Sequence, residues 1–193
     1  MGLAILILGL VIFLGGHVFV TFRGSREKAI ARLGGNGYRI AFAIVALIGL
    51  VLIIYGYGQY RAEGLIPIWS PPAFMRHITV LVMFFAVIFM TAAFVPSHIR
   101  MWLKHPMLNS IKAWALAHLL VNGDLGSIVL FGSFLAWASY ARVAAKRRGD
   151  RGATTAPAGW INDALVIVIG IIVFLALGYA FHPIVIGVPV FGR

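Results

Sequence analysis

The sequence predicts an all-α membrane protein, a polytopic bundle of transmembrane helices, and three features lead to this prediction. Hydrophobic residues make up 62% of the 193 residues and the mean hydropathy is +0.99, whereas soluble domains are closer to half apolar. Apolar runs of near 20 residues, the length that crosses a bilayer, recur along the chain. Most basic residues lie in short segments between these runs, as the positive-inside rule describes.

We expect about six spans in a single domain that covers residues 1–193. The first run has no charged segment before it and no cleavage motif after it, so we read it as an uncleaved span. The fourth begins at Pro106 and is short, and Asn122, Gly123 and Asp124 form a tight turn after it. The expected spans are 3–22, 40–58, 77–95, 106–121, 125–140 and 160–181.

The basic residues also predict the topology. If the loop after the first span is cytoplasmic, every lysine and arginine except Arg61, Arg76 and Arg193 lies in an inner loop. Both termini are then on the outer side. The excess of 16 Lys and Arg over 5 Asp and Glu is explained in this way, and we therefore expect a lipid bilayer and no nucleic acid as partner.

Several classes of chemistry are excluded or unsupported. The chain has no cysteine, which excludes disulfides, thiolate metal ligands and cysteine nucleophiles. It also has no Walker motif, no dinucleotide-binding glycine motif and no HExxH zinc motif.

Histidines inside the spans are the strongest candidates for function, because ionisable residues in membrane helices are costly. Of the six histidines, the bland interpretation, an interfacial side chain, suits those at the ends of spans: His77, His98, His105 and His182. His17 and His118 are deeper. His118 follows Pro106 by 12 residues, or roughly 18 Å of helix.

Two imidazoles from different helices, without carboxylates or thiols nearby, suit the iron of a haem. His17 and His118 are therefore the candidate ligands, and a haem is the candidate cofactor. The alternative is a pair of buried histidines that make hydrogen bonds between helices.

Neighbouring residues fit a haem site, although each has an ordinary explanation as well. Trp114 lies four residues before His118 and Asn122 four after it, on the same face of an unbroken helix. Phe13 has the same relation to His17, and Gly15 and Gly16 leave space for a flat macrocycle. On the inner side, Arg23 and Arg26 are candidate partners for the propionates.

Two stretches resemble the NnrU family of bacterial membrane proteins. They are "GGHVFVTFRG" at residues 15–24 and "HPMLNSIKAWALAHLLVNGDLGSIVLFGSFLAW" at residues 105–137. The resemblance covers essentially the whole chain and implies a multi-pass protein of the bacterial inner membrane. The NnrU family is similar to 15-cis-zeta-carotene isomerase and, more distantly, to nurim and the isoprenylcysteine methyltransferases.

The resemblance implies roles for individual residues. The isomerase binds haem b, and its second motif histidine, an axial ligand, matches His118. Its early-helix histidine matches His17, and the histidine of its His-Pro pair matches His105, the candidate catalytic residue. The isomerase has a cysteine where this chain has Ala115, so a thiolate ligand switch is absent here. A further isomerase histidine falls near Gln59 and has no equivalent.

Three functions follow from these expectations. The first is a haem protein that isomerises a carotenoid-like polyene, or one that handles a gaseous ligand in nitric oxide and denitrification metabolism. The second is an S-adenosylmethionine-dependent methyltransferase, because Lys104, His105 and Pro106 resemble the Arg-His-Pro motif of the isoprenylcysteine enzymes. The third is a structural membrane protein without a cofactor.

Overall fold

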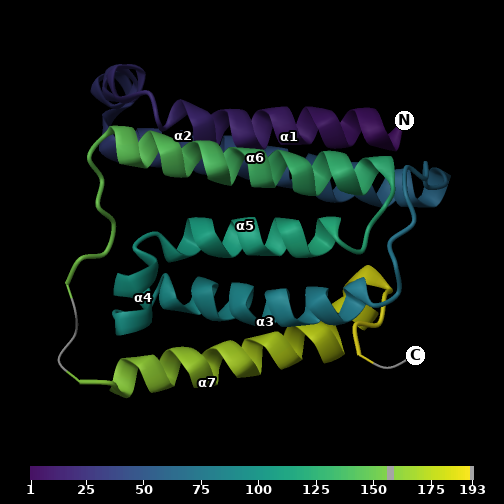
Figure 1. Cartoon of the computed structure of the whole chain (residues 1–193). Helices are drawn as coiled ribbons and strands as arrows, with labels where there is room; N and C mark the ends of the chain where they lie inside the picture. The colour runs from purple at the N-terminus through teal and green to yellow at the C-terminus, as the bar shows by residue number, and fades with distance from the viewer. Residues whose placement is uncertain (156–158, 192–193) are drawn as a thin grey trace. The chain divides into compact units, whose positions relative to one another are not determined.

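The described residues, 1–155 and 159–191 of a computed structural model, are helical along most of their length (Figure 1). No strand occurs among them, and a single antiparallel bridge joins Pro67 to Asp124. Arg193 lies outside the described residues. The expected all-α class is confirmed, with elements α1 (Gly2–Phe19), α2 (Arg23–Glu63), α3 (Met75–Ala92), α4 (His98–Leu103), α5 (Pro106–Leu119), α6 (Leu125–Arg147), α7 (Ile161–Ala176) and the π-helix η1 (Leu177–Ile186).

Within the described residues, five helices are long and apolar enough to cross a membrane: α1, α2, α3, α6, and α7 continued by η1. These helices fit a multi-pass integral membrane protein. The expected fourth span is a shorter helix, because α5 has 14 residues, or roughly 21 Å. The hydrocarbon core of a bilayer is about 30 Å thick.

The helices form two compact units, each made of two separate stretches of chain. Unit 1 contains residues 1–70 and 122–144, and unit 2 contains residues 71–121 and 145–193. His17 belongs to unit 1 and His118 to unit 2.

Close backbone contact between α1 and α2 organises unit 1. A Cβ atom on Gly9 would lie 2.6 Å from the backbone nitrogen of Ile53, and one on Gly49 would lie 2.7 Å from that of Phe13. Gly2 and Gly56 have equally little space against the facing backbone. Small residues allow membrane helices to approach in this way, so these glycines set the register between the two helices.

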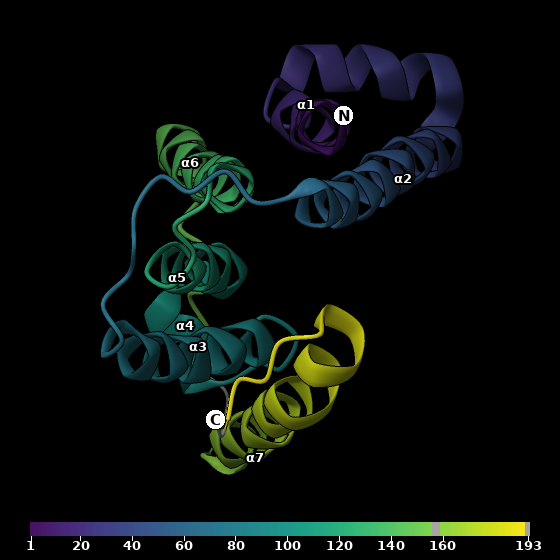
Figure 2. The same cartoon turned by 90° about the vertical axis from the view of Figure 1, so that its right-hand side faces the viewer.

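The basic segment after α1 is a helix, whereas the sequence predicted a loop. Helix α2 begins at Arg23, and only Gly34, with φ 72° and ψ 164°, leaves helical geometry within it. Figure 2 shows the resulting bend, with the first part of α2 running across the view. Glycine adopts such a positive φ without a Cβ penalty, which explains why the kink falls there.

A buried polar chain holds the start of α6 in unit 1. The Asp124 carboxylate accepts hydrogen bonds from the Ser127 backbone N–H at 2.9 Å and from the Ser127 hydroxyl at 2.6 Å. The Tyr57 hydroxyl of α2 in turn lies 2.8 Å from the Ser127 hydroxyl. The expected turn at residues 122–124 thus also caps α6 and connects it to α2.

In unit 2, α3 packs against both α5 and α7 (Figures 1 and 2). Its contact with α7 is apolar and is built on Ile88, Ala92 and Val166. Towards α5, the Ser110 hydroxyl donates to the Ala86 carbonyl at 2.7 Å and the Thr79 hydroxyl to the Ala117 carbonyl at 3.0 Å. Hydroxyl-to-carbonyl bonds of this kind join helices where no water competes.

Helix boundaries differ from the expected ones at the inner loops. The expected loop between the third and fourth spans contains α4, and α6 continues to Arg147. Residues 156–158 of the last expected loop lie outside the described residues. The last span continues beyond 181, because η1 carries the helix past Pro183.

We predict that Gly49→Ala destabilises unit 1 by about 1–3 kcal/mol, because the added methyl group has no space beside Phe13. Gly58→Ala is the matched control, since nothing lies within 4 Å of a Cβ at that position. The free energy of unfolding of each purified variant would be measured in mixed micelles with increasing SDS. Equal stability of the two variants would contradict the assigned contact.

Candidate functional site

His118 lies on the last turn of α5, and its Nδ1 is 2.9 Å from the Trp114 carbonyl oxygen. A carbonyl oxygen only accepts hydrogen bonds, so Nδ1 must carry the proton of the neutral ring. The Nε2 atom then carries the lone pair, the form in which histidine ligates a metal. The Trp114 ring lies 5.4 Å from the His118 ring, as their helical spacing predicted.

A second histidine, His182, lies beside His118 in unit 2. The two ring centroids are 6.2 Å apart and the ring planes differ by 25°. The Nδ1 of His182 is 3.1 Å from the Leu177 carbonyl, so its Nε2 also carries the lone pair. The sequence interpretation of His182 as interfacial missed this pairing, which required the packing of residues 177–186. The sequence signal that could have indicated this pairing was Pro183 within the last helix, because π-helical segments often accompany functional sites.

His17, in unit 1, has the same hydrogen-bonding state and lies among aromatic rings. Its Nδ1 is 2.7 Å from the Phe13 carbonyl oxygen. The rings of Phe13, Phe42 and Trp137 have centroids 4.4, 5.2 and 5.5 Å from that of His17. The Phe13 contact was expected from the sequence, whereas Phe42 and Trp137 come from α2 and α6.

Two buried donors near His17 have no hydrogen-bond partner among the described residues. They are Nε1 of Trp137 and the hydroxyl of Tyr38, whose ring stacks on Phe42 at 6.5 Å. Buried donors are normally paired, so these two are suited to donate hydrogen bonds to the oxygen atoms of a ligand.

The two glycines before His17 are not needed for helix packing. A Cβ on Gly15 would meet nothing within 4 Å, and one on Gly16 would make ordinary contacts of 3.7 and 3.9 Å with Val45 and Phe42. They differ in this from Gly9 and Gly49. Gly15 therefore leaves its face of α1 open, whereas Gly16 is in ordinary contact with α2.

The other expected cofactor contacts are less well supported. Arg23 and Arg26 are exposed on the first part of α2. The helical argument for Asn122 was wrong, because α5 ends at Leu119 and Asn122 lies in the following turn, in unit 1. Its place four residues after His118 therefore does not put it on the same helical face.

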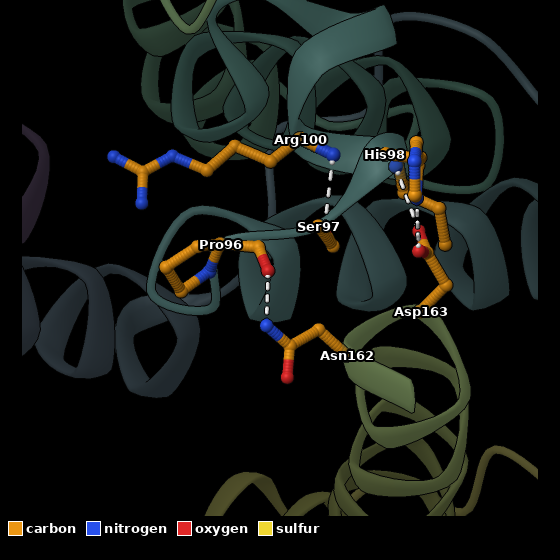
Figure 3. A network of polar contacts seen from close by, with 7 residues as sticks. Pro96, Ser97, His98, Arg100, Asn162 and Asp163 are labelled. Carbon is orange, nitrogen blue, oxygen red and sulfur yellow. Dashed lines mark hydrogen bonds and ion pairs between the residues drawn. The ribbon is translucent and has the colours of Figure 1, made fainter. Parts of the chain in front are cut away.

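His98 joins a structural network instead of forming a ligand site (Figure 3). Its Nδ1 lies 2.8 Å from one oxygen of the buried Asp163 carboxylate, and the other oxygen accepts the Ile99 backbone N–H at 2.9 Å. The Ser97 hydroxyl caps α4 by accepting the Arg100 N–H at 3.1 Å. Together these bonds join the start of α4 to the start of α7, and the His98 ring stacks on Trp160 at 4.1 Å.

The chain matches the sequence model of the NnrU family, described as "NnrU protein", over residues 5–190. It belongs to the NnrU family. The expected family is thus confirmed over nearly the whole of this NnrU chain. No curated protein and no solved structure matches it, and the likeness of this NnrU member to the isomerase, nurim and the methyltransferases stays a prediction.

A metal ion held by protein alone requires a cluster of at least three ligating side chains. Among residues 1–155 and 159–191, no three His, Asp or Glu side chains form such a cluster. A haem iron has a different requirement, because the porphyrin provides four ligands and the protein one or two. The paired imidazoles of His118 and His182 and the ring of His17 are therefore the metal-ligating groups to consider in this NnrU protein.

We predict that Asp163→Ala lowers the free energy of unfolding by about 3–5 kcal/mol, because it removes one partner of a buried pair and a cap of α4. Asn162→Ala, which removes a 2.6 Å bond to the Pro96 carbonyl at an exposed position, should cost only about 1 kcal/mol. Unfolding in SDS would measure both, and a smaller loss for Asp163→Ala than for Asn162→Ala would refute the structural role.

Proposed function

We propose that this NnrU protein binds haem b and that His118 is an axial ligand. The observation that carries the proposal is the pairing of His118 with His182, whose rings lie 6.2 Å apart. Each donates its Nδ1 proton to a backbone carbonyl. Outer hydrogen bonds of this kind orient ligating histidines and make them more basic.

The residues present fit the donor requirements of a haem. In the neutral form, His17, His118 and His182 have the lone pair on Nε2, because Nδ1 of each donates to a backbone carbonyl. Trp114 contacts His118 with its ring, and the flat, apolar macrocycle favours aromatic neighbours.

Two histidines compete for the second axial position. The sequence and the resemblance favour His17, which lies in unit 1. The structure of unit 2 favours His182 by its contact with His118. The variants described below assign the position to one of them.

A bound haem supplies one-electron chemistry and a coordination site for a small ligand. His118 would hold it through Nε2, and the Trp114 carbonyl, which accepts the Nδ1 hydrogen bond, would make that nitrogen more basic. Ala115, one turn before His118, is fully buried and supplies no thiolate.

The family resemblance and the apolar helices favour an apolar substrate reached through lipid. We propose cis–trans isomerisation of a carotenoid-like polyene, with His105 as the candidate catalytic residue, and handling of a gaseous ligand such as nitric oxide as the second activity. We further propose six spans in the bacterial inner membrane with both termini outside, α5 being the shortest span.

We expect the detergent-purified protein to show a Soret band, and His118→Ala to lose it. Visible spectra of the oxidised and reduced protein, with a pyridine haemochrome assay for haem b, would measure this. A colourless wild-type protein after expression with haem precursor, or an unchanged band in His118→Ala, would overturn the proposal.

The second ligand is assigned by His17→Ala and His182→Ala, with His77→Ala as the control because His77 is exposed at the start of α3. Loss or a shift of the band in one of the first two variants identifies the partner. Size-exclusion profiles show whether each variant is still folded.

For the activity, we expect reduced protein in nanodiscs to convert a cis-configured carotenoid to its trans isomer faster than His118→Ala does. Chromatography of the extracted pigment would measure the conversion. Equal rates for the two proteins would contradict a haem-dependent isomerase and favour the gas-handling alternative.

A further inference from the structure

A polar cavity of about 370 Å³ lies where α4 meets α5, entirely within unit 2. Its lining contains the cationic Arg100 and Lys104, the imidazole of His105, and the acidic Asp150. The cavity is at the opposite end of α5 from His118, separated by 13 residues, or roughly 20 Å of helix. It is therefore distinct from the proposed haem ligands.

The backbone at the corner where α4 meets α5 has an unusual conformation. Lys104 has φ 61°, and it is the only described residue other than glycine with a positive φ. Its carbonyl oxygen accepts the Ala153 backbone N–H at 2.9 Å, which attaches the segment 150–153 to the corner. Strained backbone of this kind is found preferentially at functional sites.

Gly152 brings that segment close to His105. Its φ is 69°, and a Cβ there would lie 2.9 Å from Nε2 of His105 and still closer to the Lys104 carbonyl. The Gly152 N–H donates to the Asp150 carboxylate at 2.8 Å. One oxygen of the only carboxylate in that lining is thus engaged by its own loop.

The remaining polar groups favour an anion. Nε2 of His105 is buried and has no hydrogen-bond partner in the described part of the chain. Arg100 and Lys104 form no ion pair there, and Figure 3 shows the Arg100 side chain extending away from the His98–Asp163 pair. No side chain caps α5, and its first residues, among them Met107 and Leu108, line the cavity at the positive end of the helix dipole.

We propose that this corner binds a phosphate group. Arginine and lysine are the usual phosphate ligands, and a helix start supplements them with backbone donors. Phe94, next in sequence to the lining residue Ala93, is 71% exposed, which suits the acyl region of a lipid. The phosphate belongs either to a phospholipid headgroup or to a soluble phosphate compound, and the two sources are separable.

The test uses the full-length protein and the double variant Arg100→Gln/Lys104→Gln, which removes both charges and keeps the side-chain length. Lys112→Gln, on α5 but outside the cavity lining, is the control for loss of charge. One arm adds phosphatidylglycerol, with phosphatidylcholine for comparison, and measures retained lipid by native mass spectrometry. The other arm adds inorganic phosphate and follows the shift in Tm.

We expect the wild type and Lys112→Gln to retain phosphatidylglycerol, and the double variant to bind it about tenfold more weakly. A Tm increase with inorganic phosphate alone, absent in the double variant, would assign the site to a soluble phosphate compound. Equal behaviour of the double variant and Lys112→Gln in both arms would overturn the proposal. The proposal would also be overturned if the protein bound S-adenosylmethionine through these two charges and did not bind phosphate.

His105→Gln tests the buried nitrogen separately, because glutamine retains a polar end where Nε2 lies. We expect it to weaken binding less than the double variant does. An unchanged Soret band in all these variants would show that any loss of phosphate binding is independent of the haem proposal.

Discussion

Close packing of helix backbones is the constraint on which unit 1 depends. Lipid chains are as apolar as the helices, so burial of apolar side chains gives little force between spans. The contact of α1 with α2 instead relies on glycines that admit the facing backbone, such as Gly9 against Ile53 and Gly49 against Phe13. The register set in this way also places His17, one turn after Phe13, against Phe42 of α2. The candidate ligand is thus positioned by contacts that involve no chemistry of its own.

Unit 2 is held by a different device, in which polar side chains bond to the backbone of a neighbouring helix. Ser110 and Thr79 join α5 and α3 in this manner, and Asp163 joins the start of α7 to the start of α4. Each such bond would be weak in water, but inside a membrane the alternative is an unsatisfied polar group. The result is that α5 is held along its length, which positions both His105 at its start and His118 near its end.

The two ends of α5 therefore suit two different ligands. Near its end, His118, Trp114 and His182 provide lone pairs and aromatic surface, which suit a haem. At its beginning, Arg100 and Lys104 provide positive charge beside the buried imidazole of His105, which suits a phosphate group. The match to the NnrU family extends over residues 5–190 and therefore includes both ends of α5. The haem and phosphate proposals both rest on the side chains described above.

The sequence by itself determined the class of fold and the family, and it located the apolar helices, because hydropathy follows directly from transfer into a bilayer. It also predicted that Trp114 lies beside His118, because residues four positions apart share one face of any α-helix. It placed Arg23 and Arg26 in a loop, whereas α2 begins at Arg23, because helix starts depend on local backbone geometry. It predicted the turn that contains Asn122, but the helical face that Asn122 was expected to share with His118 ends with α5 at Leu119. The pairing of His118 with His182 and the closure of residues 150–153 over His105 were decided by tertiary structure alone, since each joins residues more than 40 positions apart in the chain.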